Sequence, residues 1–259
     1  RRPICSCICH YFDMNKKKLI NIIIENSITL TGALLIAVLI RSFVIQPFYI
    51  PSSSMEPTLL VGDRIFVTKY SYGFSKHSLP FSPNFSKKRF LSRIPRQGDL
   101  VVFKTPADNR TDYIKRLIGL PGDEIQFIGG KIYINGAEVK REPAQISETI
   151  KCGNFNFETK TFTETLPNGV RYLASYSAEG TLLNTQKYIV PENHYFLMGD
   201  NRDCSKDSRF LNEVGYVKHL NLVGKAKIIF FSNDTNKGSL LKFWNLHNSF
   251  RFQRTFQGL

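Results

Sequence analysis

The chain has 259 residues, enough for one large domain or two of modest size. Hydrophobic residues make up 42% and aromatic residues 13% of the sequence, which excludes a disordered composition. The net charge of +14 is compatible with nucleic-acid binding, with an anionic membrane surface, or with solubility alone. The basic residues are scattered apart from short runs at 16–18 and 87–89, and the sequence contains no zinc-finger, basic-zipper or ribonucleoprotein motif. We therefore expect no nucleic acid as a partner.

The N-terminal segment, residues 1–18, is basic and holds Cys5, Cys7 and Cys9. These cysteines alternate in a C-x-C-x-C pattern, which lacks the C-x2-C spacing and the later ligand pair of a zinc site. We expect no metal site there, and no pattern in the chain indicates an organic cofactor. Met14 and the lysines that follow it have the form of a start of translation. We interpret residues 1–13 as an upstream extension outside the working protein.

Residues 19–40 are an apolar run that, as a helix, would reach about 33 Å and cross the hydrocarbon core of a membrane. Glu25 would lie near one end of the span, where a carboxylate is tolerated. A cleaved signal peptide would also have a basic start and an apolar run, but no A-x-A-like site follows Ile40. A buried core helix would not need the lysines at 16–18. An uncleaved transmembrane anchor fits best.

The lysines at 16–18 favour a cytoplasmic N-terminus. The remaining ~215 residues are then expected on the far side of the membrane, because long domains are translocated largely regardless of their charge. Residues 43–51, which follow the anchor, are apolar and aromatic and contain two prolines, so they cannot continue the helix.

From Asp63 onward the sequence consists mainly of short runs rich in β-branched and aromatic residues, separated by Gly, Pro and Asn. Gly129 and Gly130 form a two-residue hairpin signal between two of these runs. Such short strands and turns indicate an all-β sandwich or barrel-like body. The predicted strands are 64–70, 99–104, 112–118, 124–128, 131–134, 187–190, 194–198 and 222–231.

The strand pattern divides this region into a main β domain, 41–136 and 187–232, and a more polar insertion at 137–186 that is rich in Thr, Glu and Asn. Residues 75–98 are rich in Ser, Pro and Lys and are predicted to form a long exposed loop. Residues 233–259 form a C-terminal tail. The predicted fold class is therefore mainly β, with one N-terminal transmembrane helix, an all-β domain and an inserted β subdomain.

Ser54 lies shortly after the predicted anchor and could act as a nucleophile if a neighbouring base took its proton. The usual base is histidine, but no histidine of the chain accompanies a G-x-S-x-G elbow, which the sequence lacks. A histidine-based triad is possible but unsupported. The five histidines are His10, His77, His194, His219 and His247.

Lysine can replace histidine where burial lowers the pKa of its amine, because the charged form is disfavoured in a low dielectric. As a strand, 112–118 places Lys115 on one face with Tyr113 and Leu117, among apolar neighbours. Arg116 lies on the opposite face and would point towards solvent or an anion. On residue type alone, a lysine exposed on an edge strand is the commoner arrangement. The choice therefore depends on the flanking sequence.

Four segments resemble motifs of bacterial type I signal peptidases. Residues 50–63 (IPSSSMEPTLLVGD) resemble the serine motif, and residues 113–123 (YIKRLIGLPGD) resemble the lysine motif. Residues 98–103 resemble the strand that leads into the lysine motif, and residues 199–209 (GDNRDCSKDSR) resemble the C-terminal catalytic motif. The segments occur in the family's order, behind an N-terminal anchor, and together span residues 41–231. The match is therefore highly specific.

The resemblance implies that Ser54 attacks the scissile carbonyl and forms an acyl-enzyme. Lys115 would be the general base and would later activate the deacylating water. The main-chain N–H of Ser54 and the hydroxyl of Ser52 would form the oxyanion hole, since donors aimed at the developing negative charge lower the barrier.

The resemblance assigns supporting roles to three residues of the fourth motif. Ser205 would hydrogen-bond and orient the amine of Lys115, and Asp207 and Arg209 would form an ion pair beneath the site. This sequence departs from the family pattern at Ser53, a position that is often Gly. It departs again at Cys204, a position where a polar residue is common in the family. Whether that cysteine pairs with Cys152 or stays an oxidisable thiol is left open.

The resemblance also implies shallow apolar pockets for the first and third residues before the cut. A pocket shaped for a methyl group excludes larger side chains by steric clash, which matches an Ala-x-Ala substrate. The residues expected to line these pockets are Ile50, Met55, Leu59, Tyr113 and Ile114.

The function implied is removal of N-terminal signal peptides from exported preproteins at the outer face of a bacterial inner membrane. The expected partners are those signal peptides, the lipid bilayer surface and the export machinery. One alternative is a specialised Ser/Lys processing peptidase or a relative of the self-cleaving repressor proteases, although the anchor argues against the repressor type. Another is an inactive membrane-anchored assembly protein, against which the intact Ser54, Lys115 and Ser205 stand.

Overall fold

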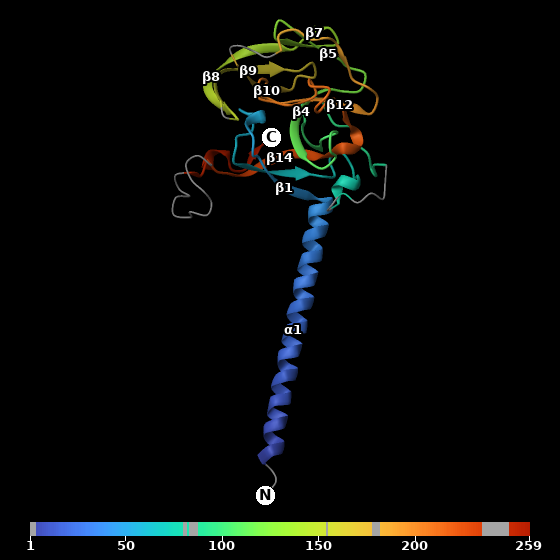
Figure 1. Cartoon of the computed structure of the whole chain (residues 1–259), viewed down its shortest axis with the longest axis vertical. Coiled ribbons are helices and arrows are strands. Elements are labelled where there is room, and N and C mark those ends of the chain that lie inside the picture. Colours follow the sequence, from blue (N-terminus) through green and yellow to red (C-terminus); the bar gives the residue numbers. More distant parts are fainter. Residues whose placement is uncertain (1–3, 80–81, 83–87, 154, 178–181, 235–248) are drawn as a thin grey trace. The chain divides into compact units, whose positions relative to one another are not determined.

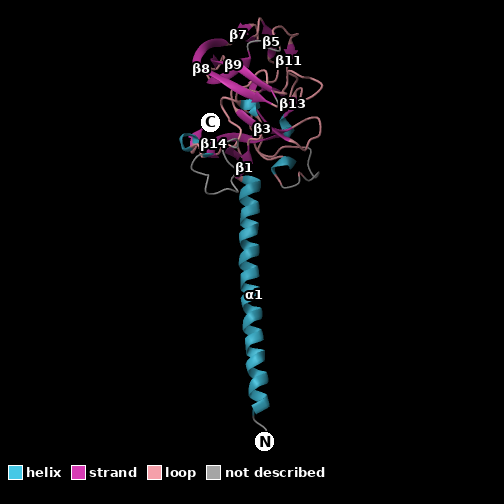
Figure 2. Cartoon of the chain, turned by 60° about the vertical axis from the view of Figure 1, so that its left-hand side comes forward, coloured by secondary structure: helices cyan, strands magenta, loops and turns pink. Residues whose placement is uncertain are grey.

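The structure is a computed structural model that describes residues 4–79, 82, 88–153, 155–177, 182–234 and 249–259 (Figure 1). The chain divides into two compact units, Arg1–Ser42 and Phe43–Leu259. Strands predominate in the described part of the second unit (Figure 2). The mainly β fold class predicted from the sequence is therefore confirmed.

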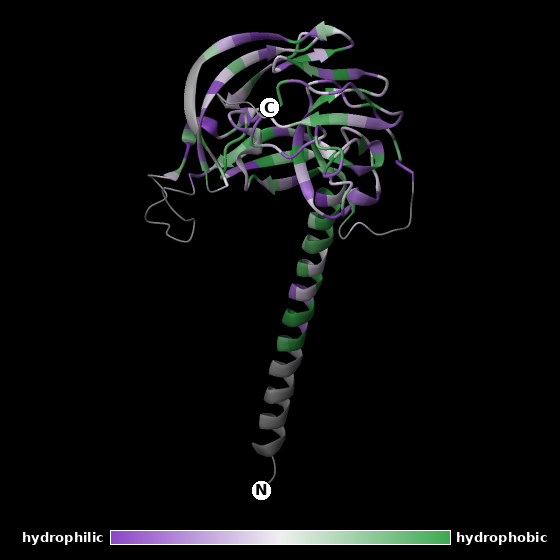
Figure 3. Ribbon diagram, turned by 45° about the horizontal axis from the view of Figure 1, so that its top comes forward, coloured by the Kyte–Doolittle hydropathy of each residue, from purple (hydrophilic) through white to green (hydrophobic). Residues whose placement is uncertain are grey.

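The first unit is formed by the helix α1, Ile4–Phe43. Its segment Lys18–Phe43 is long and apolar enough to cross a membrane, by length and composition, and hydrophobic residues cover most of that segment (Figure 3). The hydroxyls of Thr29 and Thr31 donate to main-chain carbonyls four residues earlier, at 2.9 and 2.7 Å. These polar groups are thus satisfied within the helix, as an apolar environment requires. The helix predicted at 19–40 is confirmed and extends further at both ends.

The largest sheet has eight strands, all paired antiparallel, in the order β1-β2-β14-β3-β4-β12-β13, with β15 pairing to β14. Successive residues of β3 enter different hydrophobic clusters: Val101 belongs to one cluster and Val102 belongs to another. Since successive side chains of a strand point to opposite faces, this sheet is covered on both faces. The strands are β1 Ile45–Tyr49, β2 Asp63–Thr68, β3 Leu100–Lys104, β4 Asp112–Gly119, β12 His194–Met198, β13 Val217–Lys218, β14 Leu222–Ser232 and β15 Gln257–Gly258.

Two smaller sheets, β10-β9-β8 and β11-β5-β6-β7, complete the β structure of the described residues. Gly129 and Gly130 both have positive φ angles, 56° and 74°, which confirms the predicted turn between β5 and β6. The strands are β5 Glu124–Ile128, β6 Lys131–Ile134, β7 Ala137–Glu138, β8 Lys140–Cys152, β9 Phe155–Thr165, β10 Arg171–Ser177 and β11 Tyr188–Ile189. Short 3-10 turns are η1 Ser53–Met55, η2 Lys76–Ser78, η3 His219–Asn221 and η5 Phe252–Arg254.

The predicted insertion, 137–186, contains β7 to β10, but its apolar core is not its own. One cluster of buried residues joins Leu166 and Tyr172 of the insertion to Ile125 of β5 and Phe196 of β12. The insertion is therefore packed against the main β domain through a shared core, and its exact limits stay a prediction.

All eight strands predicted from the sequence are confirmed; three have the predicted ends, and the ends of the other five differ by one or two residues. β1 was not among them, because Pro47 interrupts the apolar run at 43–51. The structure explains this strand, since β1 lies at the end of the sheet order and pairs only with β2, where a missing N–H is tolerated.

The prediction of an exposed loop at 75–98 is wrong for the beginning of that segment. Ser75, His77 and Ser78 are buried, and the η2 turn is closed by the Ser75 side chain, which accepts from the His77 main-chain N–H at 3.2 Å. Within this loop, residues 80–81 and 83–87 lie outside the described residues. Residues 235–248 of the predicted C-terminal tail also lie outside them.

Candidate active site

The turn that carries Ser54 is η1, between β1 and β2. Asn201 holds this turn from a distant part of the chain. Its main-chain N–H donates to the Ser54 carbonyl at 3.2 Å, and its side-chain amide donates to the Ser53 carbonyl at 3.1 Å. Met55, the last residue of the turn, is fully buried in the core. The Ser54 side chain is thus fixed on both sides and has only 8% of its surface exposed.

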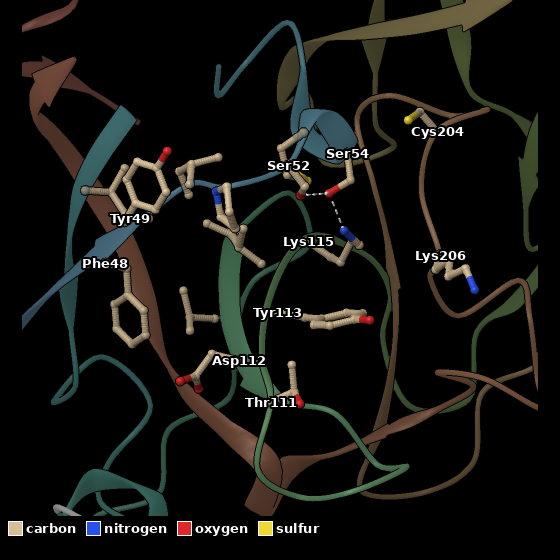
Figure 4. Close-up of a pocket in the computed structure, with 16 residues that line it drawn as sticks. Phe48, Tyr49, Ser52, Ser54, Thr111, Asp112, Tyr113, Lys115, Cys204 and Lys206 are labelled. Atoms are coloured by element: carbon tan, nitrogen blue, oxygen red, sulfur yellow. Dashed lines mark hydrogen bonds between the residues drawn. The ribbon is translucent and has the colours of Figure 1, made fainter. Parts of the chain in front are cut away.

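Lys115 reaches Ser54 from β4. Its Nζ atom donates a hydrogen bond to Ser54 Oγ at 2.7 Å (Figure 4). β4 lies between β3 and β12, with Lys115 opposite Val101, and the lysine is only 4% exposed. Burial lowers the pKa of the Lys115 amine to about 8, because the charged form is removed from water. An amine with this pKa is partly neutral near pH 8 and can accept the proton of the hydroxyl it contacts.

Two carboxylates act in the opposite direction on Lys115, and each has its own arginine. The charges of Asp207 and Asp200 raise the pKa of the amine, but less than burial lowers it. Arg209 Nε donates to Asp207 at 2.8 Å, and Arg116 donates to both carboxylate oxygens of Asp200 at 2.8 and 2.7 Å. Because each carboxylate is paired with its own arginine, their combined effect on the lysine is smaller than that of burial.

The Asp207–Arg209 pair is buried, with 0% and 2% of the side chains exposed. Burial by itself raises the pKa of Asp207, but the charge and hydrogen bonds of Arg209 keep that pKa below its ordinary value. Asp207 also accepts from the main-chain N–H of Gly199 at 2.9 Å. The pair therefore closes the loop 199–209 on itself, beneath the serine and the lysine.

Ser52 lies beside Ser54, with its Oγ atom 3.3 Å from Ser54 Oγ (Figure 4). Unlike Ser54 it is exposed, so its hydroxyl is free to turn towards a bound group. Its assignment to an oxyanion hole stays a prediction.

Ser205 is buried next to Gly199, but the structure does not join it to Lys115. Among the described residues, its Oγ atom has no hydrogen-bond partner. A Cβ atom at Gly199 would overlap Ser205 Oγ and would come within 2.5 Å of the Ser54 carbonyl oxygen. Glycine at 199 is therefore what allows Ser205 and the Ser54 turn to approach each other. The role of Ser205 in orienting the lysine stays a prediction.

A pocket of about 410 Å³ opens beside Ser54 and Lys115 (Figure 4). Four of the five residues predicted to form a substrate pocket line it, namely Ile50, Met55, Tyr113 and Ile114. The other lining residues are Phe48, Tyr49, Pro51, Ser52, Ile65, Val102, Thr111, Asp112, Cys204 and Lys206.

Leu59, the fifth residue predicted for the pocket, does not line it. The chain turns after η1, where the Leu59 N–H donates to the Met55 carbonyl at 2.9 Å. This turn directs Leu59 into the cluster that contains Ile65 and Val67, where it is fully buried. Leu59 belongs to the core that supports the Ser54 turn.

The histidines that the structure describes lie away from this pocket. Of the histidines whose side chains the structure describes, His77, His194 and His219, none lines the pocket. His219 contacts Ser92 Oγ at 2.8 Å, and burial lowers the pKa of His219 to about 4. The side chain of His10 and the whole of His247 lie outside the described residues. Within the described residues, no group of three or more His, Cys, Asp or Glu side chains could hold a metal ion.

Several residues of the site were not assigned from the sequence. The sequence predicted that the Arg116 side chain points towards solvent or an anion. In the structure it is buried against the Asp200 carboxylate, and its guanidinium lies 4.3 Å from the Tyr172 ring centroid. Glu164 and Arg202 form a second buried ion pair at 2.7 Å. For Arg116, the only signal in the sequence was the alternation of side chains along its strand. For Glu164 and Arg202 there was no local signal, because the two residues are 38 positions apart.

Comparisons with known proteins agree with the resemblance of the sequence motifs to signal peptidases. A family model described as signal peptidase, peptidase S26, matches residues 23–231. Signal peptidase I of Rickettsia bellii is 40% identical over 241 residues, covering 86% of this chain and 81% of that protein. Signal peptidase I of Rickettsia typhi is 44% identical over 212 residues, covering 78% of each.

A solved structure, a signal peptidase I of Enterococcus faecalis, is 27% identical and covers 51% of this chain and 97% of that chain. Its TM-score of 0.30 is too low to support an argument about the fold.

We predict that replacing Lys115 with methionine stabilises the protein most at low pH. The folded pKa is about 8 and the ordinary value is 10.5, so unfolding takes up a proton between these pH values. The stability of the unsubstituted protein therefore rises with pH across that window. The variant lacks the lysine and therefore this pH dependence. Its free energy of unfolding should exceed that of the unsubstituted protein by about 3 kcal/mol below pH 8, and the difference should disappear by pH 10.5. Denaturant unfolding of the full chain in detergent at several pH values measures this difference in stability. A difference that does not depend on pH would contradict the prediction.

We predict that Leu59→Ala destabilises the protein by about 2–5 kcal/mol, because it removes a fully buried side chain and leaves a cavity. Leu211→Ala is the matched control, since Leu211 is 43% exposed. Denaturant unfolding at pH 7 compares the two variants. Equal losses of stability would show that Leu59 is not part of the core.

Proposed function

Because the chain belongs to the signal peptidase family, peptidase S26, we propose that it removes signal peptides from exported preproteins with Ser54 as nucleophile and Lys115 as general base. The chain is a serine endopeptidase of that family. The observation that carries the assignment of the two residues is the 2.7 Å hydrogen bond between Lys115 Nζ and Ser54 Oγ, both of which belong to buried residues. It supports a serine whose proton is taken by a neutral lysine.

In the first half of the reaction, Ser54 Oγ attacks the carbonyl carbon of the scissile bond, and Lys115 Nζ takes the hydroxyl proton. The main-chain N–H of Ser54 and the hydroxyl of Ser52 donate to the negative oxygen that develops. When the carbon–nitrogen bond breaks, the protonated lysine gives its proton to the leaving amine. The signal peptide is then esterified to Ser54, and the mature protein leaves.

In the second half, Lys115 is neutral again and takes a proton from a water molecule that attacks the ester. The proton passes to Ser54 Oγ as the acyl group leaves, which restores the starting state. Ser205, buried beside this site, is proposed to orient the amine through a hydrogen bond formed during the cycle. The Asp207–Arg209 pair is proposed to hold the loop that carries Ser205.

The pocket beside Ser54 supports a preference for apolar residues before the cut. Its walls include Ile50, Met55 and Ile114, whose apolar side chains favour an apolar substrate segment. We propose cleavage after Ala-x-Ala-like sequences, because walls that close around a methyl group exclude larger side chains.

The apolar segment Lys18–Phe43 supports a membrane anchor. With the lysines at 16–18 on the cytoplasmic side, the β domain is proposed to act outside the bacterial inner membrane. Its partners would be membrane-inserted signal peptides, the bilayer surface and the export machinery that delivers the preproteins.

We predict that Ser54→Ala and Lys115→Ala each abolish cleavage while the fold persists, because either change removes one side of the proton transfer. Lys131→Ala is the matched control, a lysine exposed on β6 that should keep normal turnover. Purified full chain in detergent, a preprotein with an Ala-x-Ala site, and mass measurement of the products test this. Near-normal turnover in either site variant would overturn the assignment of the dyad.

We predict that kcat/KM rises with pH and is half-maximal near pH 8, where the Lys115 amine is half neutral. Below that pH the rate should fall by about tenfold for each unit, because only the neutral amine accepts a proton. Initial rates from pH 5 to 9 measure this profile. A maximum near pH 5 is incompatible with a neutral lysine as the base.

A further inference from the structure

A disulfide bond joins the predicted insertion to the wall of the catalytic pocket. Cys152, the last residue of β8, is bonded to Cys204, and their Cα atoms are 5.6 Å apart. Cys204 lines the pocket together with Ser54 and Lys115. The bond therefore connects a strand of the insertion to a residue that lines the pocket.

The two ends of the catalytic loop 199–209 have strong anchors. Asn201 donates to the carbonyls of the Ser54 turn, and Asp207 and Arg209 are held in their buried ion pair. Between these anchors, the stretch 203–206 runs along the pocket, to which Cys204 and Lys206 contribute.

Noncovalent bonds also hold this middle stretch, and they include an ion pair between Lys206 and Glu213 at 3.1 Å. Asp203 accepts from the Ser177 main-chain N–H at 2.7 Å, and the Ser205 carbonyl accepts from Arg209 at 3.4 Å. The Ser53 hydroxyl donates to Cys204 Sγ at 3.4 Å, since a disulfide sulfur carries no hydrogen. The covalent bond to Cys152 is the strongest link that any described residue of 203–206 makes outside its own loop.

The other end of the bond lies at the turn of a long hairpin. Cys152 forms the last pair of β8 and β9, opposite Phe155, and Gly153 follows with φ 62°. Phe155 is 70% exposed, so the turn has little apolar packing of its own. Contacts between β8 and η1 bring this hairpin to the Ser54 turn. The disulfide thus joins the end of a hairpin to a loop at the pocket.

We propose that the Cys152–Cys204 disulfide is a positioning element that fixes one wall of the substrate pocket and thereby sets the preference for small residues. This inference rests on the proposed function, because it concerns the same pocket. Reduction by a dithiol transfers two electrons and two protons to the bond, gives two cysteine thiols, and converts the dithiol to its cyclic disulfide. The freed loop then leaves the wall at Cys204 unfixed, and larger side chains enter.

The test compares substrates with Ala or Val at the residue before the cut, using the oxidised full chain in detergent. Cys152→Ala removes the bond but leaves residue 204 in place, so it separates the tether from the side chain that lines the pocket. We expect the Ala-over-Val ratio of kcat/KM to fall by about tenfold or more in this variant. Dithiothreitol should produce the same fall in the unsubstituted protein, and reoxidation should reverse it.

Two controls isolate the bond. The triple variant Cys5→Ser, Cys7→Ser, Cys9→Ser should respond to dithiothreitol as the unsubstituted protein does, and Cys152→Ala should not respond further. Mass measurement after thiol alkylation, with and without reductant, reports whether 152 and 204 are bonded in the active protein. Rates are measured well below the unfolding temperature of each variant.

The outcomes separate this inference from the proposed function. If the oxidised, unsubstituted protein does not cut the Ala substrate, the proposed function is wrong. If it cuts that substrate and Cys152→Ala lowers only the unfolding temperature, with the Ala-over-Val ratio unchanged, the bond is merely structural and the inference is overturned. An active protein with both cysteines alkylated before reduction overturns it as well.

Discussion

The removal of one lysine amine from water is the constraint on which the rest of this structure depends. A buried lysine normally either keeps its charge beside a carboxylate or loses it. Here two carboxylates lie near enough to act on Lys115, but each is bound by an arginine of its own. Burial therefore dominates, and the amine has a pKa of about 8 in direct contact with Ser54. The two arginines matter to the lysine because they occupy the acids that would otherwise keep it charged.

The sheet meets this constraint through the position of β4. β4 lies between β3 and β12, its residues from Lys115 onward are buried, and the alternation of its side chains sends Lys115 and Arg116 to opposite faces. Lys115 reaches the Ser54 turn on one face, and Arg116 reaches Asp200 on the other. Asp200 begins the loop that returns to hold the Ser54 turn through Asn201. One strand thus organises Lys115, its electrostatic surroundings and the loop that holds the Ser54 turn.

Much of this could be predicted from the sequence, because the informative patterns are local. Eight strands followed from short β-branched runs and turn residues, and the contact of Ser54 with Lys115 followed from motif resemblance. The features that were missed depend on tertiary structure. β1 needed the sheet edge to tolerate Pro47, and Leu59 needed the turn after Met55 to direct it into the core. The partners of Arg116 and Glu164 lie 84 and 38 residues away, beyond any local pattern.

The predicted insertion is more closely tied to the site than its polar composition suggested. Glu164 of β9 is 2% exposed and binds Arg202 of the catalytic loop through two hydrogen bonds, at 3.0 and 2.7 Å. Burial by itself raises the pKa of Glu164, but Arg202 and two tyrosine hydroxyls hold that pKa below its ordinary value. A buried pair of this kind is costly to break, since either partner alone would be an uncompensated charge. The ion pair and the Cys152–Cys204 bond therefore hold one loop from the same sheet, and that loop carries the surroundings of the lysine. Changes in the insertion would reach the site through these two links, so the insertion is a structural part of the catalytic unit.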